Sequence, residues 1–271
     1  MCGRITLAVQ SYKDLADYFH AAVDPEVEAF YTPRYNIAPM SAHVVLRMHD
    51  GHREIVPARW GLINYWAKDR SVGSRQINAR SETARTKPAY REAFERRRCV
   101  VPADGFFEWS GPKGARKPLW FHPAAGGLLT LAGLYETWKD PETGEPVRTF
   151  TVLTTPSNDF IAPIHDRMPA ILLSKDVDRW LETPEKGEPS NAEEANALLR
   201  PAPNDFLVAR PVSTQVNSVG NEGPDLIREV REEEPPPAKA TTPASKTAAK
   251  RKKAAAPVDD MPLFAGLKRG A

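Results

Sequence analysis

Short apolar segments separated by Pro and Gly constrain the fold of this 271-residue chain more than any other feature. They predict strands at 3–9, 42–48, 54–60, 99–107, 119–122, 128–138, 149–155, 170–173 and 206–212. Helices are expected at 11–20, where Ser11 would be the N-cap, and at 89–97, 174–183 and 191–200. Because the strands outnumber the helices and do not alternate with them, the sequence predicts an α+β fold with a mixed, largely antiparallel sheet.

The end of the chain differs in composition from the rest. After about Glu234 the sequence is rich in Pro, Ala, Thr and Lys, and such a segment cannot build a core. We therefore expect one folded domain at 2–231 and a disordered tail at 232–271. Residues 239–271 hold eight Lys or Arg and two Asp, a balance of +6, so the net charge of +2 leaves −4 on residues 1–238. Overall charge therefore gives no argument for nucleic-acid binding, which would need a local basic patch.

Cysteine usage and the absence of targeting patterns indicate the class of protein. Cys2 and Cys99 are the only cysteines, which argues against a disulfide scaffold and suits a reducing compartment. The sequence has neither a C-x-x-C pair nor an H-E-x-x-H motif, so we expect no metal and no other cofactor. It also lacks a signal-peptide pattern and a long apolar run, which predicts a soluble, intracellular protein.

The start of the chain carries an unusual pair of nucleophiles. If Met1 is removed, Cys2 presents an α-amine and a thiol on one two-carbon unit. Their usual pKa values are about 7.7–8.0 and about 8.5, so both nucleophiles are partly available at neutral pH. An amine condenses with an aldehyde to an imine, which a neighbouring thiol can close to a thiazolidine ring. The alternative is that Cys2 is an ordinary N-terminal residue.

The segment Arg75–Arg98 combines many basic residues with aromatic neighbours. It holds eight Lys or Arg against three Glu, with Trp60, Tyr65 and Trp66 upstream and Phe106, Phe107 and Trp109 downstream. Such a mixture suits single-stranded nucleic acid, whose phosphates are neutralised and whose bases stack on aromatic rings. The alternative is a solvated helix face beside ordinary core aromatics.

Three polar residues are candidates for chemistry or positioning. Glu108 lies between large apolar side chains, and burial there would raise its pKa and suit it to general acid–base work, unless it is an exposed strand-end residue. His165 lies in a Pro-flanked cluster and is either a proton shuttle or a structural histidine; adjacent Asp166 is expected to point away from it. Asn78 either holds a nucleophile in place or caps a helix, and nearby Arg80 is suited to phosphate.

Seven short motifs occur in a characteristic order. They are MCGR at 1–4, YNIAP at 35–39, WG at 60–61, INARSET at 77–83, CVVPADGFFEW at 99–109, IHDRMP at 164–169 and VNSVGN at 216–221. In this combination the chain closely resembles the SOS-response-associated peptidase (SRAP) family over about residues 2–230. The resemblance does not extend to the tail.

The resemblance implies a single domain with a barrel-like sheet and flanking helices, which binds abasic sites in single-stranded DNA and forms a thiazolidine crosslink. Cys2 would be the nucleophile and Asn78 would position it. Glu108 would promote opening of the deoxyribose to its aldehyde and move protons, and His165 would assist that transfer and reversal of the crosslink. The implied protein is a monomeric enzyme of the DNA damage response, with possible lyase-like activity. It would be cytoplasmic and nucleoid-associated in a bacterium, or nuclear in a eukaryote.

The resemblance also implies a set of DNA contacts. The residues expected to hold phosphates are Arg4, Arg80 and Arg167, and those expected near the strand are Pro39, Trp66, Trp109 and Thr154. A second phosphate-binding Arg of the family has no direct counterpart after Arg80, and Arg85 or Lys87 is expected to take its place.

Two rival functions and one partner remain open. Cys2 and His165 could form a cysteine peptidase, of which removal of Met1 by the chain itself would be a minor version, or the domain could bind single-stranded DNA without catalysis. The tail ends in Met261-Pro262-Leu263-Phe264, which is similar to short apolar peptides that dock on bacterial sliding clamps. The basic run at 250–253 is a solvated linker, an additional DNA contact or a nuclear address.

Overall fold

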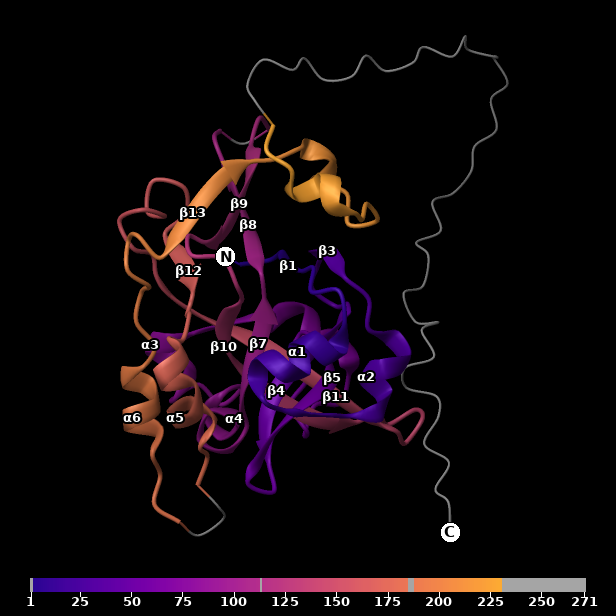
Figure 1. Ribbon diagram of the computed structural model, residues 1–271. Coiled ribbons are helices and arrows are strands. Elements are labelled where there is room, and N and C mark those ends of the chain that lie inside the picture. The colour runs from indigo at the N-terminus through magenta and orange to yellow at the C-terminus, as the bar shows by residue number, and fades with distance from the viewer. Residues whose placement is uncertain (1, 113, 185–187, 231–271) are drawn as a thin grey trace, which may run out of the picture.

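A computed structural model describes residues 2–112, 114–184 and 188–230 (Figure 1). The predicted disordered tail at 232–271, with its apolar Leu263 and Phe264, lies outside the described residues. The domain boundary at 231 therefore stays a prediction.

Five strands close into a barrel at the centre of the domain. In order around the barrel they are β11 (Pro146–Pro156), β10 (Leu129–Lys139), β7 (Arg98–Ala103), β4 (Ala42–His49) and β5 (His52–Trp60). These neighbours pair antiparallel, and β5 then pairs with β11 in the parallel direction, with Arg59 opposite Thr149. The prediction of an α+β fold with a mixed, largely antiparallel, barrel-like sheet is confirmed.

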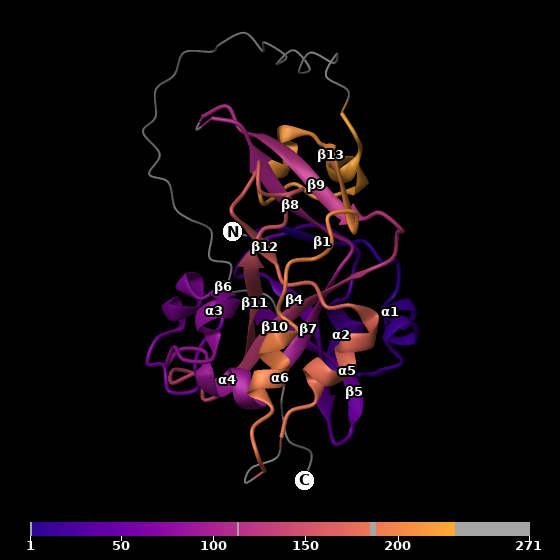
Figure 2. The same ribbon diagram turned by 90° about the vertical axis from the view of Figure 1, so that its left-hand side faces the viewer.

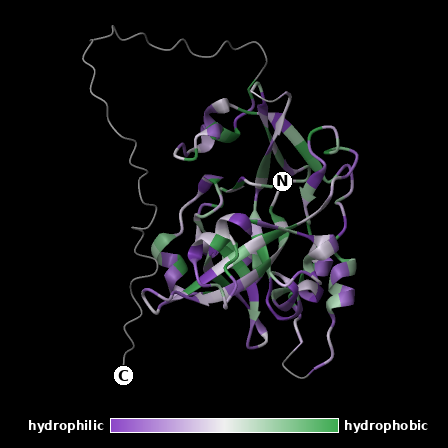
Figure 3. Cartoon of the chain, turned by 180° about the vertical axis from the view of Figure 1, so that it is seen from behind, coloured by the Kyte–Doolittle hydropathy of each residue, from purple (hydrophilic) through white to green (hydrophobic). Residues whose placement is uncertain are grey.

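The barrel strands supply most of the hydrophobic core. Val45, Val100 and Leu131 are fully buried, and Trp60 stacks on Phe150 with the ring centroids 6.0 Å apart. Burying each such side chain contributes about 1.5–3 kcal/mol. Hydrophobic residues gather on the central strands and hydrophilic ones on the outer helices and loops (Figure 3). The flanking helices are α1 (Tyr12–Phe19), α2 (Pro25–Phe30), α3 (Ser81–Ala84), α4 (Arg91–Arg96), α5 (Val177–Leu181) and α6 (Ala192–Ala197).

A second sheet lies against one end of the barrel (Figures 1 and 2). Its strand order is β13 (Leu207–Pro211), β9 (Lys117–Pro123), β8 (Gly105–Ser110), β1 (Ile5–Leu7) and β3 (Arg34–Ile37). At the same end of the barrel the last residues of β11 pair with β6 (Asn78–Arg80) and β12 (Arg167–Pro169). Segments far apart in the sequence therefore meet where the two sheets join. The remaining strand, β2 (Ala22–Val23), pairs with β5.

The predicted strand at 99–107 is two strands in two different sheets. Pro102 lies inside β7, opposite Thr130 of β10, so the first of these strands continues through the proline. The chain changes sheets at Asp104, whose carboxylate accepts hydrogen bonds from the Thr6 hydroxyl and the Ala8 amide. A Cβ atom at Gly105 would lie 2.4 Å from the Trp120 ring, so only glycine fits at the start of β8.

Several local predictions are confirmed and others are wrong. The prediction of Ser11 as an N-cap is confirmed, because Ser11 accepts a hydrogen bond from the Lys13 amide at the start of α1. Asp50 and Gly51, with φ of 48° and 78°, join β4 to β5. The expected strand at 170–173 is wrong: strand β12 ends at Pro169, and Ile171 makes only an isolated bridge to Leu131. Strands β3 and β6, at positions expected to be loops, are three or four residues long and are specified by pairing with distant strands.

No helix in the described part of the chain is long and apolar enough to cross a membrane.

Candidate active site

Cys2 lies just before β1, at the junction of the two sheets, and its side chain is fully buried. Its carbonyl oxygen accepts a hydrogen bond of 2.7 Å from Nδ2 of Asn78 in β6. Strand pairing between β6 and β11 places this amide, because Asn78 lies opposite Val152. Asn78 therefore holds the backbone of Cys2 in place across 76 residues of sequence. It is a strand residue and not a helix cap, since the residue that precedes α3 is Arg80.

Burial and a neighbouring carboxylate both raise the pKa of the Cys2 thiol. Desolvation is the larger cause, the charge of Glu108 adds to it, and the pKa reaches about 12. The thiol is therefore protonated at neutral pH. The Glu108 carboxyl group is therefore close enough to the Cys2 sulfur for its charge to act on the thiol.

Glu108 is buried on β8, with 5 % of its surface exposed. Desolvation raises the pKa of this carboxyl group from its usual 4.5 to about 7. At neutral pH both the acid and the base forms are therefore populated, which is the property required of a group that both donates and accepts protons. The alternative of an exposed strand-end glutamate is wrong.

His165 is oriented by its neighbours in the loop that leads into β12. Its Nδ1 lies 2.9 Å from the Arg167 amide, which donates a hydrogen bond to it. The Asp166 carboxylate lies 3.0 Å from the same Nδ1, so the expectation that Asp166 points away is wrong. Desolvation lowers the pKa of His165, so the neutral ring is favoured at pH 7.

A pocket of about 230 Å³ opens beside these groups. It is lined by Glu108 and Trp109 from β8, by Ile164 and His165 from the loop before β12, and by Arg116. The two predicted proton-transfer residues thus face one cavity. Together with the Asn78–Cys2 hydrogen bond and the Cys2–Glu108 interaction, this brings all four predicted catalytic residues into one site.

Arg4, in the first motif, contacts residues of three other motifs. Its Nη1 donates to the Asn36 side-chain oxygen at 2.5 Å and to the Val216 carbonyl at 2.7 Å. Its guanidinium lies 5.7 Å from the centroid of the Trp109 ring, and the indole Nε1–H of Trp109 donates to Asn217 at 2.7 Å. Arg4 therefore builds a wall of the site, and its contact with phosphate stays a prediction.

Arg167 and Thr154 are buried beneath the site. The Arg167 guanidinium is bonded to both carboxylate oxygens of Glu82 and to the Thr154 carbonyl, and only 7 % of the residue is exposed. Thr154 is 2 % exposed. These contacts join β12, β11 and α3, so both residues hold these elements together. Direct DNA contacts by them stay predictions.

The other predicted DNA contacts lie nearer the surface. Trp66 is 56 % exposed and Tyr65 beside it 54 %, so these rings are available for stacking. Arg80 and Lys87 are also exposed, and Pro39 is half-buried. Arg85 forms an ion pair with Glu193 at 2.5 Å, whereas the Lys87 side chain makes no ion pair or hydrogen bond with the described residues. Lys87 is therefore the less constrained of the two substitutes for the missing arginine.

Sequence reasoning missed two residues of the site. Arg116 lies in a Gly-rich loop, and nothing in its local sequence distinguishes it from other exposed arginines. Asn36 is a member of the quoted YNIAP motif, but its role in holding Arg4 appears only in the fold. Among the described residues, no group of three His, Cys, Asp or Glu is arranged to hold a metal ion.

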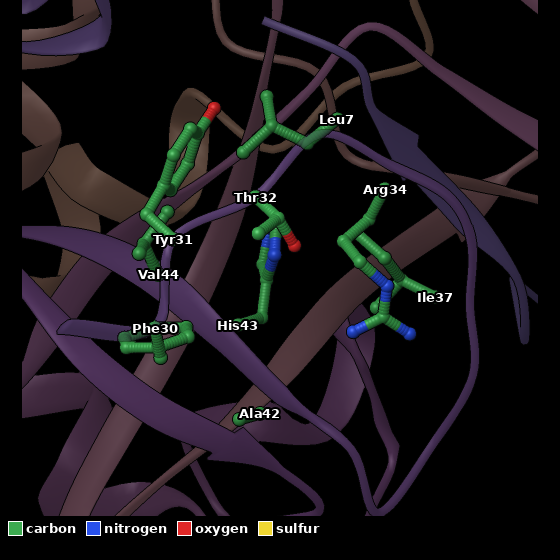
Figure 4. A pocket seen from close by; sticks show the side chains of 9 residues that line it. All are labelled: Leu7, Phe30, Tyr31, Thr32, Arg34, Ile37, Ala42, His43 and Val44. Carbon is green, nitrogen blue, oxygen red and sulfur yellow. The ribbon is translucent and has the colours of Figure 1, made fainter. Parts of the chain in front are cut away.

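A separate cavity of about 60 Å³ lies between the second sheet and the barrel (Figure 4). It is lined by apolar residues such as Leu7 and Val44 and by His43. Nε2 of His43 lies 2.8 Å from the Pro102 carbonyl, and burial lowers the pKa of this ring to about 4. His43 is therefore a neutral, structural histidine.

Known proteins of similar sequence and structure match nearly all of the described chain. The profile of the family described as SOS response associated peptidase (SRAP) matches residues 1–219. The abasic site processing protein YoqW of Bacillus subtilis (strain 168) is 40 % identical over 233 residues, which cover 84 % of this chain and 99 % of that protein. The abasic site processing protein HMCES of Gallus gallus is 35 % identical over 231 residues, which cover 74 % and 67 %.

Two solved structures have a similar fold. A protein from Bacteroides thetaiotaomicron superimposes with a TM-score of 0.74 at 24 % identity, over 85 % of this chain and all of that one. A protein from Bordetella bronchiseptica gives a TM-score of 0.65 at 27 % identity, over 78 % of this chain and all of that one.

Proposed function

Because this chain belongs to the SOS response associated peptidase (SRAP) family, we propose that it processes abasic sites in single-stranded DNA by forming a covalent crosslink through Cys2. The observation that carries the proposal is the arrangement of four residues in one site: Glu108 and His165 line one pocket, and Cys2 interacts with both Glu108 and Asn78. Two relatives named as abasic site processing proteins support the choice of substrate. The protein would act wherever single-stranded DNA is exposed, at the nucleoid of a bacterium or in a nucleus.

The proposed reaction begins with removal of Met1, which makes Cys2 the first residue. Glu108, with a pKa of about 7, takes the proton of the C1′ hydroxyl of the abasic sugar and returns one to the ring oxygen, which opens the ring to its aldehyde. The α-amine of Cys2 then attacks the aldehyde carbon, and water leaves to give an imine. Addition of the thiol across the C=N bond forms the C–S bond of the thiazolidine, and the thiol proton moves to the nitrogen. The overall change is the loss of one water.

Asn78 and His165 assist this sequence of steps. The Asn78 amide fixes the Cys2 carbonyl, and its buried Oδ1 has no hydrogen-bond partner among the described residues, so it is available to an N–H of the freed amine. In the proposed reaction the His165 ring, which lines the same pocket as Glu108, exchanges protons with the sugar oxygens.

The first test of the proposal is a denaturing gel of the protein mixed with a single-stranded oligonucleotide that contains one abasic site. We expect a heat-stable, shifted band with the abasic oligonucleotide and none with undamaged DNA. Absence of this band from protein shown by mass to lack Met1 would contradict the proposal.

The peptidase alternative makes a different demand on Cys2. A cysteine peptidase needs a thiolate and hence a lowered pKa, whereas burial raises the pKa of this thiol to about 12. Crosslinking needs both the amine and the thiol, whereas peptide cleavage needs only the thiol. Acetylation of the α-amine therefore abolishes crosslinking and spares any peptidase activity.

Replacing Asn78 by Ala is expected to slow crosslinking about 10-fold or more, because the Cys2 carbonyl loses its donor and the amine loses its acceptor. The measurement is the single-turnover rate at saturating abasic DNA. Asn204→Ala is the matched control, since Asn204 is exposed and, among the described residues, its side chain is bonded only to Asp159. Equal rates for the Asn78→Ala variant and the control would show that Asn78 does not position Cys2.

We also propose that the tail tethers the domain to a sliding clamp through Leu263 and Phe264, because a short apolar segment follows a basic linker there. The double substitution Leu263→Ala and Phe264→Ala is expected to abolish clamp binding measured by surface plasmon resonance. The crosslinking rate on free oligonucleotides should not change. Failure of the intact protein to bind a clamp would end this proposal.

A further inference from the structure

Arg116 lies in the connection between β8 and β9, which projects beyond the body of the domain (Figure 2). The Ala115 amide donates to the Pro112 carbonyl at 3.0 Å, and Gly114 has φ of 94°, a conformation that favours glycine. This turn places Arg116 immediately before the start of β9. Its side chain is exposed and contributes to two adjoining pockets, one of which is the pocket of Glu108 and His165.

The second pocket has a volume of about 400 Å³ and shares Trp109 and Arg116 with the first. It is lined by Trp109, Gly114, Arg116 and Asn217. The Trp109 ring is fixed by its bond to Asn217 and by the Arg4 guanidinium, so it offers a rigid aromatic surface. The second pocket is a shallow depression open to solvent, a shape that suits a flat group stacked on the ring. Its lining offers an aromatic ring, an amide and a guanidinium, and it contains no carboxylate.

The charge of Arg116 also reaches the neighbouring pocket. It lowers the pKa of Glu108 and that of His165, although desolvation is the largest influence on each. Arg116 therefore faces both proton-transfer groups from the boundary between the two cavities. An anion bound to Arg116 would therefore lie between a group in the first pocket and a group in the second.

We propose that the pocket of Trp109, Asn217 and Arg116 is a subsite for the nucleotide next to the abasic site, and that Arg116 binds the phosphate joining the two. This inference rests on the proposed function, since it takes the abasic sugar to occupy the pocket of Glu108 and His165. The base of the neighbouring nucleotide stacks on Trp109, and the guanidinium neutralises the phosphate by charge-assisted hydrogen bonds.

The test compares Arg116→Gln, which removes the charge, with Arg116→Lys, which keeps it. Lys175→Gln is the control for loss of one positive charge, because Lys175 is exposed and lies in the segment before α5. The oligonucleotide carries tetrahydrofuran, an abasic analogue that has no aldehyde and cannot crosslink. Arg116→Gln should weaken its equilibrium binding about 10-fold, and the slope of log K against log salt should fall by about 0.7. Arg116→Lys should retain most of the affinity, and Lys175→Gln should equal the wild type.

An uncharged linkage in the DNA identifies which phosphate Arg116 binds. Oligonucleotides with a methylphosphonate on the 5′ or the 3′ side of the lesion lack that negative charge. On one of the two, the wild type and Arg116→Gln should bind equally. An equal loss for Arg116→Gln on both neutral substrates, or no loss on normal DNA, would overturn the proposal.

A fluorescent base reports the stacking. The fluorescence of 2-aminopurine next to the lesion, on the side that the methylphosphonate identifies, should fall on binding because the base stacks on Trp109. Unchanged fluorescence on both sides would contradict the subsite. These binding measurements do not need a covalent product, so failure of the subsite and failure of the crosslinking proposal can be distinguished.

Discussion

Replacing Cys2 by Ala is expected to abolish the heat-stable crosslink to abasic DNA, with a loss of at least about 1000-fold in rate. Alanine keeps the α-amine, so an imine still forms, but no thiol remains to close the ring. The imine hydrolyses during denaturation, and the gel shows free DNA. The measurement is the fraction of abasic oligonucleotide that stays shifted after heating in detergent.

Cys2→Ser separates the two steps of the proposed reaction. The serine hydroxyl is a much weaker nucleophile than a thiol, so this variant should give no heat-stable band but should be trapped on DNA by borohydride, which reduces the imine. A form that retains Met1 should give neither product. If Cys2→Ala left every interaction with abasic DNA unchanged, the domain would be a binding module without catalysis.

Replacing Glu108 by Gln is expected to lower the crosslinking rate about 10²- to 10⁴-fold, because a positioned acid–base group is lost. The wild-type rate should depend on pH with an apparent pKa near 7, the value to which burial raises the Glu108 pKa. Single-turnover rates between pH 5 and 9 measure both effects. A Glu108→Gln variant with the wild-type pH profile would show that another group moves the proton.

The same substitution is expected to stabilise the fold at neutral and higher pH. Since the Glu108 pKa is higher in the folded protein than in the unfolded chain, stability falls as pH rises from about 4.5 to about 7. The rise of the Glu108 pKa from 4.5 to about 7 corresponds to a loss of about 3 kcal/mol in the free energy of unfolding, at 1.36 kcal/mol for each pKa unit. Glu108→Gln should therefore unfold at higher denaturant concentration than the wild type at pH 8, and the two should converge near pH 4. A less stable variant at pH 8 would contradict the burial argument.

The burial and the raised pKa of Glu108 could be predicted from its local sequence. Phe106, Phe107 and Trp109 surround it, and large apolar neighbours in a strand predict burial and a raised pKa. Such local reasoning succeeds where the immediate neighbours determine the environment of a side chain. The barrel-like α+β fold was likewise expected from the order of short strands and from the family resemblance.

The relation between Cys2 and Asn78 could not be derived from spacing. Their hydrogen bond spans 76 residues and depends on β6, which is only three residues long and forms because β11 pairs with it. The segment 99–107 also depends on contacts between residues far apart in the sequence. Its change of sheets at Asp104 depends on the contacts of Asp104 with Thr6 and Ala8. Only the family resemblance brought Asn78 and Cys2 together before the fold was known.

Arginines show most clearly what sequence cannot distinguish. Arg167 is buried against Glu82 and Thr154, Arg85 pairs with Glu193, and Arg116 lines two pockets. In the sequence all three are basic residues in polar surroundings. Their different environments arise from tertiary contacts, which neither composition nor periodicity records.

The most direct test of the proposed chemistry is the intact mass of the product formed with an abasic oligonucleotide. We predict the sum of the two components, with Met1 absent from the protein and one water lost. Tandem mass spectrometry should place the adduct on Cys2, with the thiol no longer free to react with iodoacetamide. A product with the adduct on a lysine, or with a free Cys2 thiol, would contradict thiazolidine formation.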